Sequence, residues 1–217
     1  MNLKTLSEIR KAVEGLSTGL TKTYDLAYKA FHSPARNWFG QQPVWDDLRV
    51  SLERANNQGG ATPTYTIFKN GTKAYRFANG NALDFTVQLP HGWKEGTTIY
   101  PHLHWCPTTN VSPSDNVGIG FEYTWASIGG AWGATTTVTR DVATGVNSAY
   151  KHIMNDFDDD GIDATGQTVS SVLVCRVFRQ AAAADDYASG AFFLELDFHY
   201  QADTFGSYRR NYKWGQD

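Results

Sequence analysis

The sequence predicts a mainly β fold, an antiparallel two-sheet sandwich, with a jelly roll favoured over other sandwich topologies, preceded by an N-terminal α-helix and an extended arm. Apolar and polar residues alternate over 83–89, 117–125 and 192–200, as in strands with one buried face. Turn-forming pairs, Asn70-Gly71 and Gly129-Gly130, lie between strand-like segments. No helical periodicity interrupts these segments after residue 64, which favours antiparallel pairing in two packed sheets.

The composition limits the class of protein. The 217 residues suffice for one β domain with an appendage, and 41% hydrophobic residues exclude a disordered chain. The net charge is −3 without a basic block, which excludes binding of duplex nucleic acid through a charged face. No long apolar run and no apolar leader near Met1 occur, so we expect no membrane contact and assembly in a cytoplasm.

The N-terminal segment, 1–33, is predicted to be an oligomerisation or docking helix. Its apolar residues recur at intervals of three and four, and they are Leu6, Ile9, Val13, Leu16 and Leu20. Gly15 and Gly19 each weaken the helix by about 1 kcal/mol relative to alanine. Two apolar positions per heptad make a stripe narrow enough to need a partner. The stripe either packs on the chain's own β domain or mediates self-association or docking. We favour self-association into a homo-oligomer, and among oligomers we favour a trimer.

Two further segments complete the expected organisation. Residues 34–63 are predicted to be an extended arm and loop, because prolines, unpatterned aromatic residues and the stretch 56–60 replace any periodicity. Residues 64–217 are predicted to form the β-sandwich domain. Its expected strands are 65–69, 73–77, 83–89, 98–106, 117–126, 131–140, 150–154, 168–179 and 191–201.

Three histidines are the first candidate for chemistry. His102 and His104 share one face of a strand, because side chains two residues apart point the same way. His199 lies on the polar face of the last strand, so the three would form a metal site if the strands are neighbours. The spacing from Gly96 to His102 and His104 resembles the opening of the first cupin motif, which implies a metal-dependent enzyme; the glutamate and the second motif are missing. The alternative is hydrogen bonding on a polar sheet face.

An acidic segment, 156–163, is the second candidate. Asp156, Asp158 and Asp160 precede Gly161 in the order of a calcium loop, in which carboxylate oxygens surround the ion. Gln167 occupies the place of the closing glutamate, which excludes an EF-hand. The segment is therefore either a looser calcium loop or a solvated acidic turn.

Other kinds of site leave weaker signals. The sequence has no activated nucleophile motif, phosphate loop or dinucleotide fingerprint. Cys106 and Cys175 fall in apolar segments and are expected to be buried thiols rather than a disulfide. Four tryptophans would either stack on sugars or pack in the core, and they are Trp93, Trp125, Trp132 and Trp214.

Three blocks carry a resemblance to a known class of protein. They read HGWKEGTTIYPHLHW at 91–105, GFEY at 120–123 and ELDFHY at 195–200, the last followed by DTFGS at 203–207. Together they span over half the chain and resemble structural proteins of tailed bacteriophages. The resemblance implies a virion component such as a head decoration, neck or tail protein, with capsid, portal or tail proteins as partners. It names no catalytic residue and no cofactor.

These observations together favour a non-enzymatic structural component of a bacteriophage virion. It would mediate subunit assembly or attachment on the head or tail, and it would reside in the virion after assembly in the host cytoplasm. A cupin-like metal-dependent enzyme using His102, His104 and His199 is one alternative. A glycan-binding module for host recognition is the other.

Overall fold

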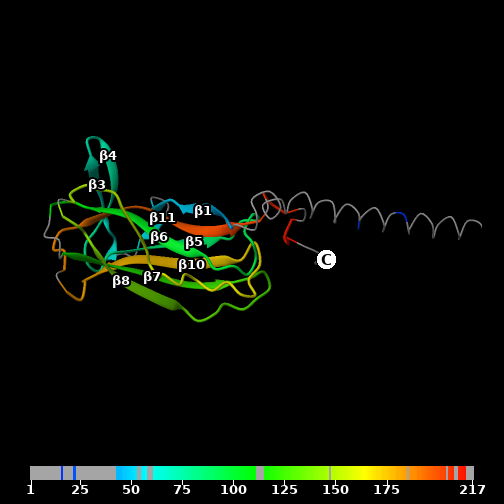
Figure 1. The fold of residues 1–217 in the computed structure, drawn as a ribbon. Helices are drawn as coiled ribbons and strands as arrows, with labels where there is room; N and C mark the ends of the chain where they lie inside the picture. The colour runs from blue at the N-terminus through cyan, green and yellow to red at the C-terminus, as the bar shows by residue number, and fades with distance from the viewer. Residues whose placement is uncertain are drawn as a thin grey trace, which may run out of the picture.

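The fold is an antiparallel two-sheet β-sandwich (Figure 1). The computed structural model describes Leu16, Lys22, 43–52, 55–57, 61–110, 115–146, 148–184, 186–203, 205–207 and 210–213. Its strands are β1 (Val44–Val50), β2 (Asn56–Asn57), β3 (Thr64–Lys69), β4 (Thr72–Phe77), β5 (Ala82–Gln88), β6 (Tyr100–Pro107), β7 (Asn116–Ala126), β8 (Thr136–Ala143), β9 (Ile153–Asp156), β10 (Val172–Gln180) and β11 (Ala191–Ala202).

The first sheet has the order β3-β4-β11-β6-β9, and its long strand β11 is shared by two partners along one edge. β4 pairs with β11 over 191–193, and β1 pairs with the same edge over 196–202. On its other edge β11 pairs with β6 along nearly the whole length of both strands. This places β6 and β11 at the centre of the sheet.

The second sheet has the order β2-β5-β10-β7-β8 and packs against the first. Strands that follow one another in sequence often lie in different sheets: β4, β6, β9 and β11 belong to the first sheet, whereas β5, β7, β8 and β10 belong to the second. All ladder pairings are antiparallel. The predicted antiparallel two-sheet sandwich is therefore confirmed.

Apolar side chains from both sheets fill the space between them. Leu103, Trp105 and Phe198 point inward from the first sheet, and Phe121 and Val177 point inward from the second; all five are fully buried. The Phe121 ring lies edge-on to the Phe198 ring, with their centroids 5.9 Å apart, so the two sheets are in direct contact. Since alternate residues face opposite ways, the histidines that flank Leu103 point to the outer face of the first sheet.

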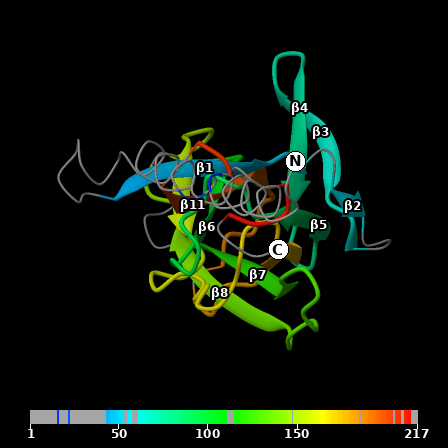
Figure 2. The ribbon, with the colours of Figure 1, turned by 90° about the vertical axis from the view of Figure 1, so that its right-hand side faces the viewer.

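The β3–β4 hairpin projects beyond the sandwich (Figures 1 and 2). Asn70 adopts the left-handed conformation at its turn, with φ of 54°, as predicted for the Asn-Gly pair. Tyr65 and Ile67 on its edge strand β3 are 49% and 59% exposed. The hairpin therefore presents apolar side chains to solvent at the margin of the first sheet.

The structure corrects the predicted organisation at several points. The segment 34–63, predicted as arm and loop, contains β1 and β2, each paired with a strand of the sandwich. The strand predicted over 131–140 is β8, which begins only at Thr136, and the strand predicted over 150–154 is β9, which begins at Ile153. The predicted N-terminal helix lies outside the described residues apart from single positions, one of which, Leu16, is exposed.

Candidate functional site

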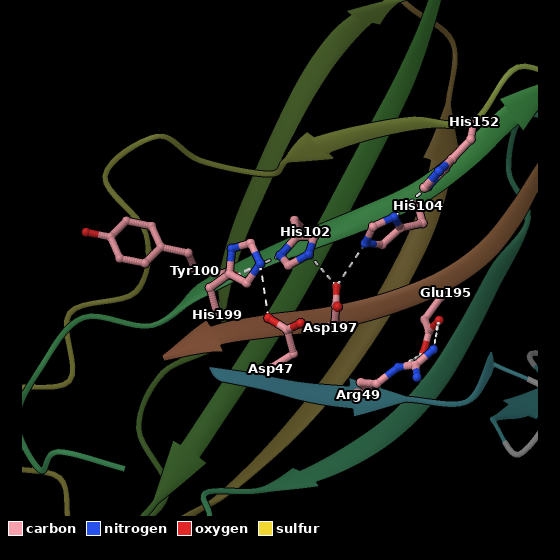
Figure 3. A network of polar contacts seen from close by, with 9 residues as sticks. All are labelled: Asp47, Arg49, Tyr100, His102, His104, His152, Glu195, Asp197 and His199. Atoms are coloured by element: carbon pink, nitrogen blue, oxygen red, sulfur yellow. Dashed lines mark hydrogen bonds and ion pairs between the residues drawn. The ribbon is translucent and has the colours of Figure 1, made fainter. Parts of the chain in front are cut away.

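A cluster of imidazole and carboxylate side chains lies on the outer face of the first sheet (Figure 3). The strand register creates it: His102 of β6 pairs with Asp197 of β11, and His199 of β11 pairs with Asp47 of β1. His104 lies two residues beyond His102 on the same face. Three neighbouring strands therefore bring residues far apart in the sequence into one patch.

His102 and Asp197 form the buried centre of the cluster. Nε2 of His102 lies 2.5 Å from Oδ1 of Asp197, and the two residues are only 1% and 5% exposed. Burial alone would lower the pKa of His102, but the hydrogen bond and charge of Asp197 outweigh burial and raise it. Burial would likewise raise the pKa of Asp197, but His102 outweighs burial and lowers it.

His104 is the second imidazole that faces the same carboxylate. Its Nε2 lies 3.4 Å from Oδ1 of Asp197, and its Nδ1 lies 2.6 Å from Nε2 of His152, whose ring stacks on it. Burial lowers the pKa of His104, which favours the neutral ring. Two histidines thus face the same oxygen of Asp197, and the ring of His102 is more deeply buried than the ring of His104.

His199, the third predicted ligand, belongs to the patch but takes a different position. Its ring packs on His102 with centroids 3.9 Å apart, and its Nε2 lies 3.1 Å from Oδ1 of Asp47. Among the described residues, the group whose donor atoms all lie within 4.8 Å of one another is His102, His104 and Asp197. The sequence analysis did not include Asp197 among the ligands, because the register between β6 and β11 cannot be read from the sequence.

The cluster opens to solvent at one side. A hollow of the outer face is lined by the histidines together with Arg49, Met154 and Glu195. Arg49 closes its rim through a bidentate ion pair with Glu195, at 2.6 and 2.5 Å. A small molecule or water can therefore approach His104 while His102 stays covered.

The acidic segment forms a turn with local partners. Oδ1 of Asp158 accepts a hydrogen bond from the backbone N–H of Asp160 at 3.1 Å, and Arg140 pairs with Asp159 at 2.6 Å. Asp156 ends β9 opposite His102. In the described part of the chain, the carboxylates of Asp156, Asp158 and Asp160 do not gather as a set of cation ligands, so this geometry gives the calcium prediction no support.

The tryptophans proposed as sugar platforms are dispersed. Trp93 is fully buried, Trp125 packs against the core, and Trp132 is exposed; Trp214 lies outside the described residues. Trp45, which the prediction did not include, is half exposed and meets Tyr100 edge-on at 5.7 Å. No row of exposed tryptophans forms among the residues described.

Comparisons with known proteins assign no family. No protein-family profile and no curated protein matches the chain. Among solved structures, infectious bursal disease virus, Gx strain, gives a TM-score of 0.32 at 12% identity over 75% of this chain and 33% of that one. The family 22 carbohydrate-binding module of Clostridium thermocellum Xyn10B gives 0.31 at 9% identity, over 80% and 94%.

The Gt strain of the same virus gives a TM-score of 0.25 at 15% identity, over 64% of this chain and 38% of that one. The chain thus spans about a third of the length of the viral chains it matches. At these TM-scores the similarity assigns neither a family nor a function. In the part of the chain that the structure describes, no helix is long and apolar enough to span a membrane.

Proposed function

We propose that this protein is a non-enzymatic structural component of a bacteriophage virion, in which the β-sandwich is the body of an assembling subunit. The observation that carries the proposal is the β3–β4 hairpin, which presents an apolar face and an edge strand outside the sandwich. The resemblance of the blocks at 91–105, 120–123 and 195–207 to tailed-phage structural proteins supports the same class.

The strand order supports a jelly roll as the topology. Apart from the added strands β1, β2 and β3, the two sheets read β4-β11-β6-β9 and β5-β10-β7-β8. In this order the early strands β4 and β5 pair with the late strands β11 and β10, which pair in turn with β6 and β7 from the middle of the chain, as in a double Greek key. Jelly rolls occur in capsid proteins, lectins and cupins, so the topology is compatible with the proposal without selecting it.

The apolar face of the hairpin continues the inner face of the first sheet. Tyr65 pairs with Tyr75, their rings 5.0 Å apart, and Ile67 lies on the same face, which leads to Phe77 in the core. Within the described residues, β3 has no neighbour on its outer edge. An exposed edge strand with apolar side chains invites pairing with another chain, and we infer that a second copy of this chain covers it.

The filled interior argues against the cupin-like alternative. A cupin-like site needs ligands that point into the space between the sheets, whereas His102 and His104 point outward and Leu103 and Trp105 occupy that space.

In the proposed role the protein would contact its own copies, with a trimer favoured, and capsid, portal, neck or tail proteins. Its location would be the virion, after assembly in the host cytoplasm.

Sedimentation velocity on the purified chain tests the proposal. Ile67→Asp places a charge on the hairpin face and should convert trimers to monomers, while Ile128→Asp, a matched change at an isoleucine that is 53% exposed between β7 and β8, should not. The pair Ile9→Asp and Leu16→Asp tests the N-terminal stripe in the same assay. Monomeric wild-type protein at high concentration, together with its absence from purified particles, would contradict the proposal.

A further inference from the structure

We propose that His102, His104 and Asp197 bind one divalent transition-metal ion, of the class of zinc, on the outer face of the first sheet. The site is separate from the assembly role, and neither conclusion depends on the other. Its ligands come from the two central strands, β6 and β11, which pair from Ala191 to His199 with one irregularity between Phe193 and Glu195. A rigid pair of strands is a suitable support for a small coordination site.

The donor atoms already lie near the separations that such an ion needs. A tetrahedral ion with bonds of about 2.0–2.2 Å holds its ligand atoms about 3.3–3.6 Å apart. Nε2 of His104 lies 3.4 Å from Oδ1 of Asp197, which matches this value. Nε2 of His102 lies 2.5 Å from the same oxygen, so this pair has to open by about 1 Å, a change within reach of side-chain rotation on fixed strands.

The hydrogen-bond partners of the cluster leave a place for a cation. Oδ1 of Asp197 is buried and has no well-aligned hydrogen-bond donor among the described residues. Nδ1 of His102 lies 3.3 Å from the carbonyl oxygen of Tyr100, which would accept the N–H of this ring when Nε2 binds a metal. In the metal-bound protein, the cation would take the place of the proton that links Nε2 of His102 to Oδ1 of Asp197.

The second histidine is oriented in the same way. Nδ1 of His104 lies 2.6 Å from Nε2 of His152, which would accept the N–H of His104 when its Nε2 binds a metal. A metal-binding histidine usually donates its other N–H to a carbonyl, carboxylate or similar acceptor. Tyr100 and His152 provide such acceptors for His102 and His104.

The donor set decides the class of ion. Two imidazole nitrogens and one carboxylate suit zinc and its first-row neighbours, whereas calcium and magnesium prefer oxygen ligands throughout. Three protein ligands leave a fourth position, which would face the hollow beside Arg49 and Met154 and take a water molecule. His199 is no ligand in this scheme, because its Nε2 is engaged by Asp47.

Zinc titration of chelator-treated full-length protein by calorimetry tests the proposal, with metal content checked by mass spectrometry. We expect one ion per chain. His104→Ala and Asp197→Asn should each weaken binding by more than about 100-fold, and His152→Ala by about 10-fold. His199→Ala is the comparison variant, because its ring packs on His102 without being a ligand; its loss should weaken binding by no more than about 10-fold.

Circular dichroism of each variant without metal separates loss of a ligand from loss of the fold. His104 is the best first target because its side chain is 25% exposed. Cobalt provides a second readout on the wild-type protein, since its visible absorption is much stronger for a tetrahedral ion than for the hydrated one. The proposal is wrong if zinc fails to bind stoichiometrically, if His104→Ala binds as the wild type does, or if His199→Ala loses binding as completely as His104→Ala.

Discussion

Arg179 donates a hydrogen bond from Nη2 to the carbonyl oxygen of Tyr187 at 2.5 Å, in the interior at one end of the sandwich. The same guanidinium donates to the carbonyl oxygens of Phe77 and Ser189 at 2.9 and 2.7 Å. The Tyr187 hydroxyl in turn accepts the backbone N–H of Thr108 at 2.9 Å. One arginine of the second sheet thus fixes the loop that closes this end against the first sheet.

We expect Arg179→Met to lower the free energy of unfolding by about 3 kcal/mol or more, because several buried carbonyl groups lose a charged donor. Urea unfolding with linear extrapolation measures this. Arg176→Met, on the same strand, is the control: Arg176 pairs with Glu122 at the surface, so its loss should cost less than about 1 kcal/mol. Equal losses for the two variants would contradict the role given to Arg179.

Gly120→Ala should destabilise the second sheet, because a Cβ at this position would lie 2.1 Å from the Phe178 ring that covers it. The expected cost is about 1–3 kcal/mol, as the ring must move from its place between Gly120 and Arg176. Gly133→Ala is the matched control, since its Cβ would meet only a carbonyl oxygen at 4.0 Å. Thermal unfolding of the two variants measures the difference in stability. In a Phe178→Ala background, Gly120→Ala should cost much less stability, because the ring that its Cβ would meet is gone.

The two cysteines should react slowly with thiol reagents in the native protein. Both are free and buried; burial raises the pKa of Cys106 to about 11 and the pKa of Cys175 further still. At pH 8 only about one Cys106 thiol in a thousand is then ionised, and the thiolate is the reactive form. We expect labelling at least about 100-fold slower than in urea, and rapid labelling of native protein would contradict the buried placement.

The Cys106 thiol makes the free energy of unfolding depend on pH in the alkaline range. The pKa of Cys106 is higher in the folded chain, about 11, than the value of 9.0 that applies without burial. The protonated thiol therefore contributes stability that is complete below about pH 9 and is lost as the pH rises through 11. The urea midpoint of the wild-type protein should fall between about pH 9 and 11, and the midpoint of Cys106→Ala should fall less over the same range.

Most of the sandwich could be predicted from the sequence, because most of its strands can be recognised from the local pattern of apolar and polar residues. The alternation in 117–125 and 192–200 locates the strands β7 and β11. In β11 the phase changes at an irregularity between Phe193 and Glu195, so Phe193 rather than Phe192 belongs to the core. β1 was missed because Asp46 and Asp47 interrupt any alternation. Its strand depends on a free edge of β11, and on the bond from the Tyr200 hydroxyl to Asp46 at 2.7 Å, which are long-range features.

The candidate site was predicted in part for a related reason. His102 and His104 share a face by the two-residue period of a strand, which the sequence reveals. The identity of the third group depends on how β6 and β11 are registered, and the ladder places Asp197 rather than His199 opposite His102. A shift of two residues in that register would have favoured His199, and nothing local in the sequence distinguishes the two.

The pairing of β1 with β11 has a mechanical consequence. The ladder runs from Val44 and Ala202 to Val50 and Leu196, and its hydrogen bonds lie across the strand direction. Tension applied ahead of Val44 along the strand would load all these bonds together, in shear, and transmit the force to a strand inside the sheet. Tension at a right angle would open the bonds one after another. The strength of this strand as an anchor therefore depends on the direction of pull.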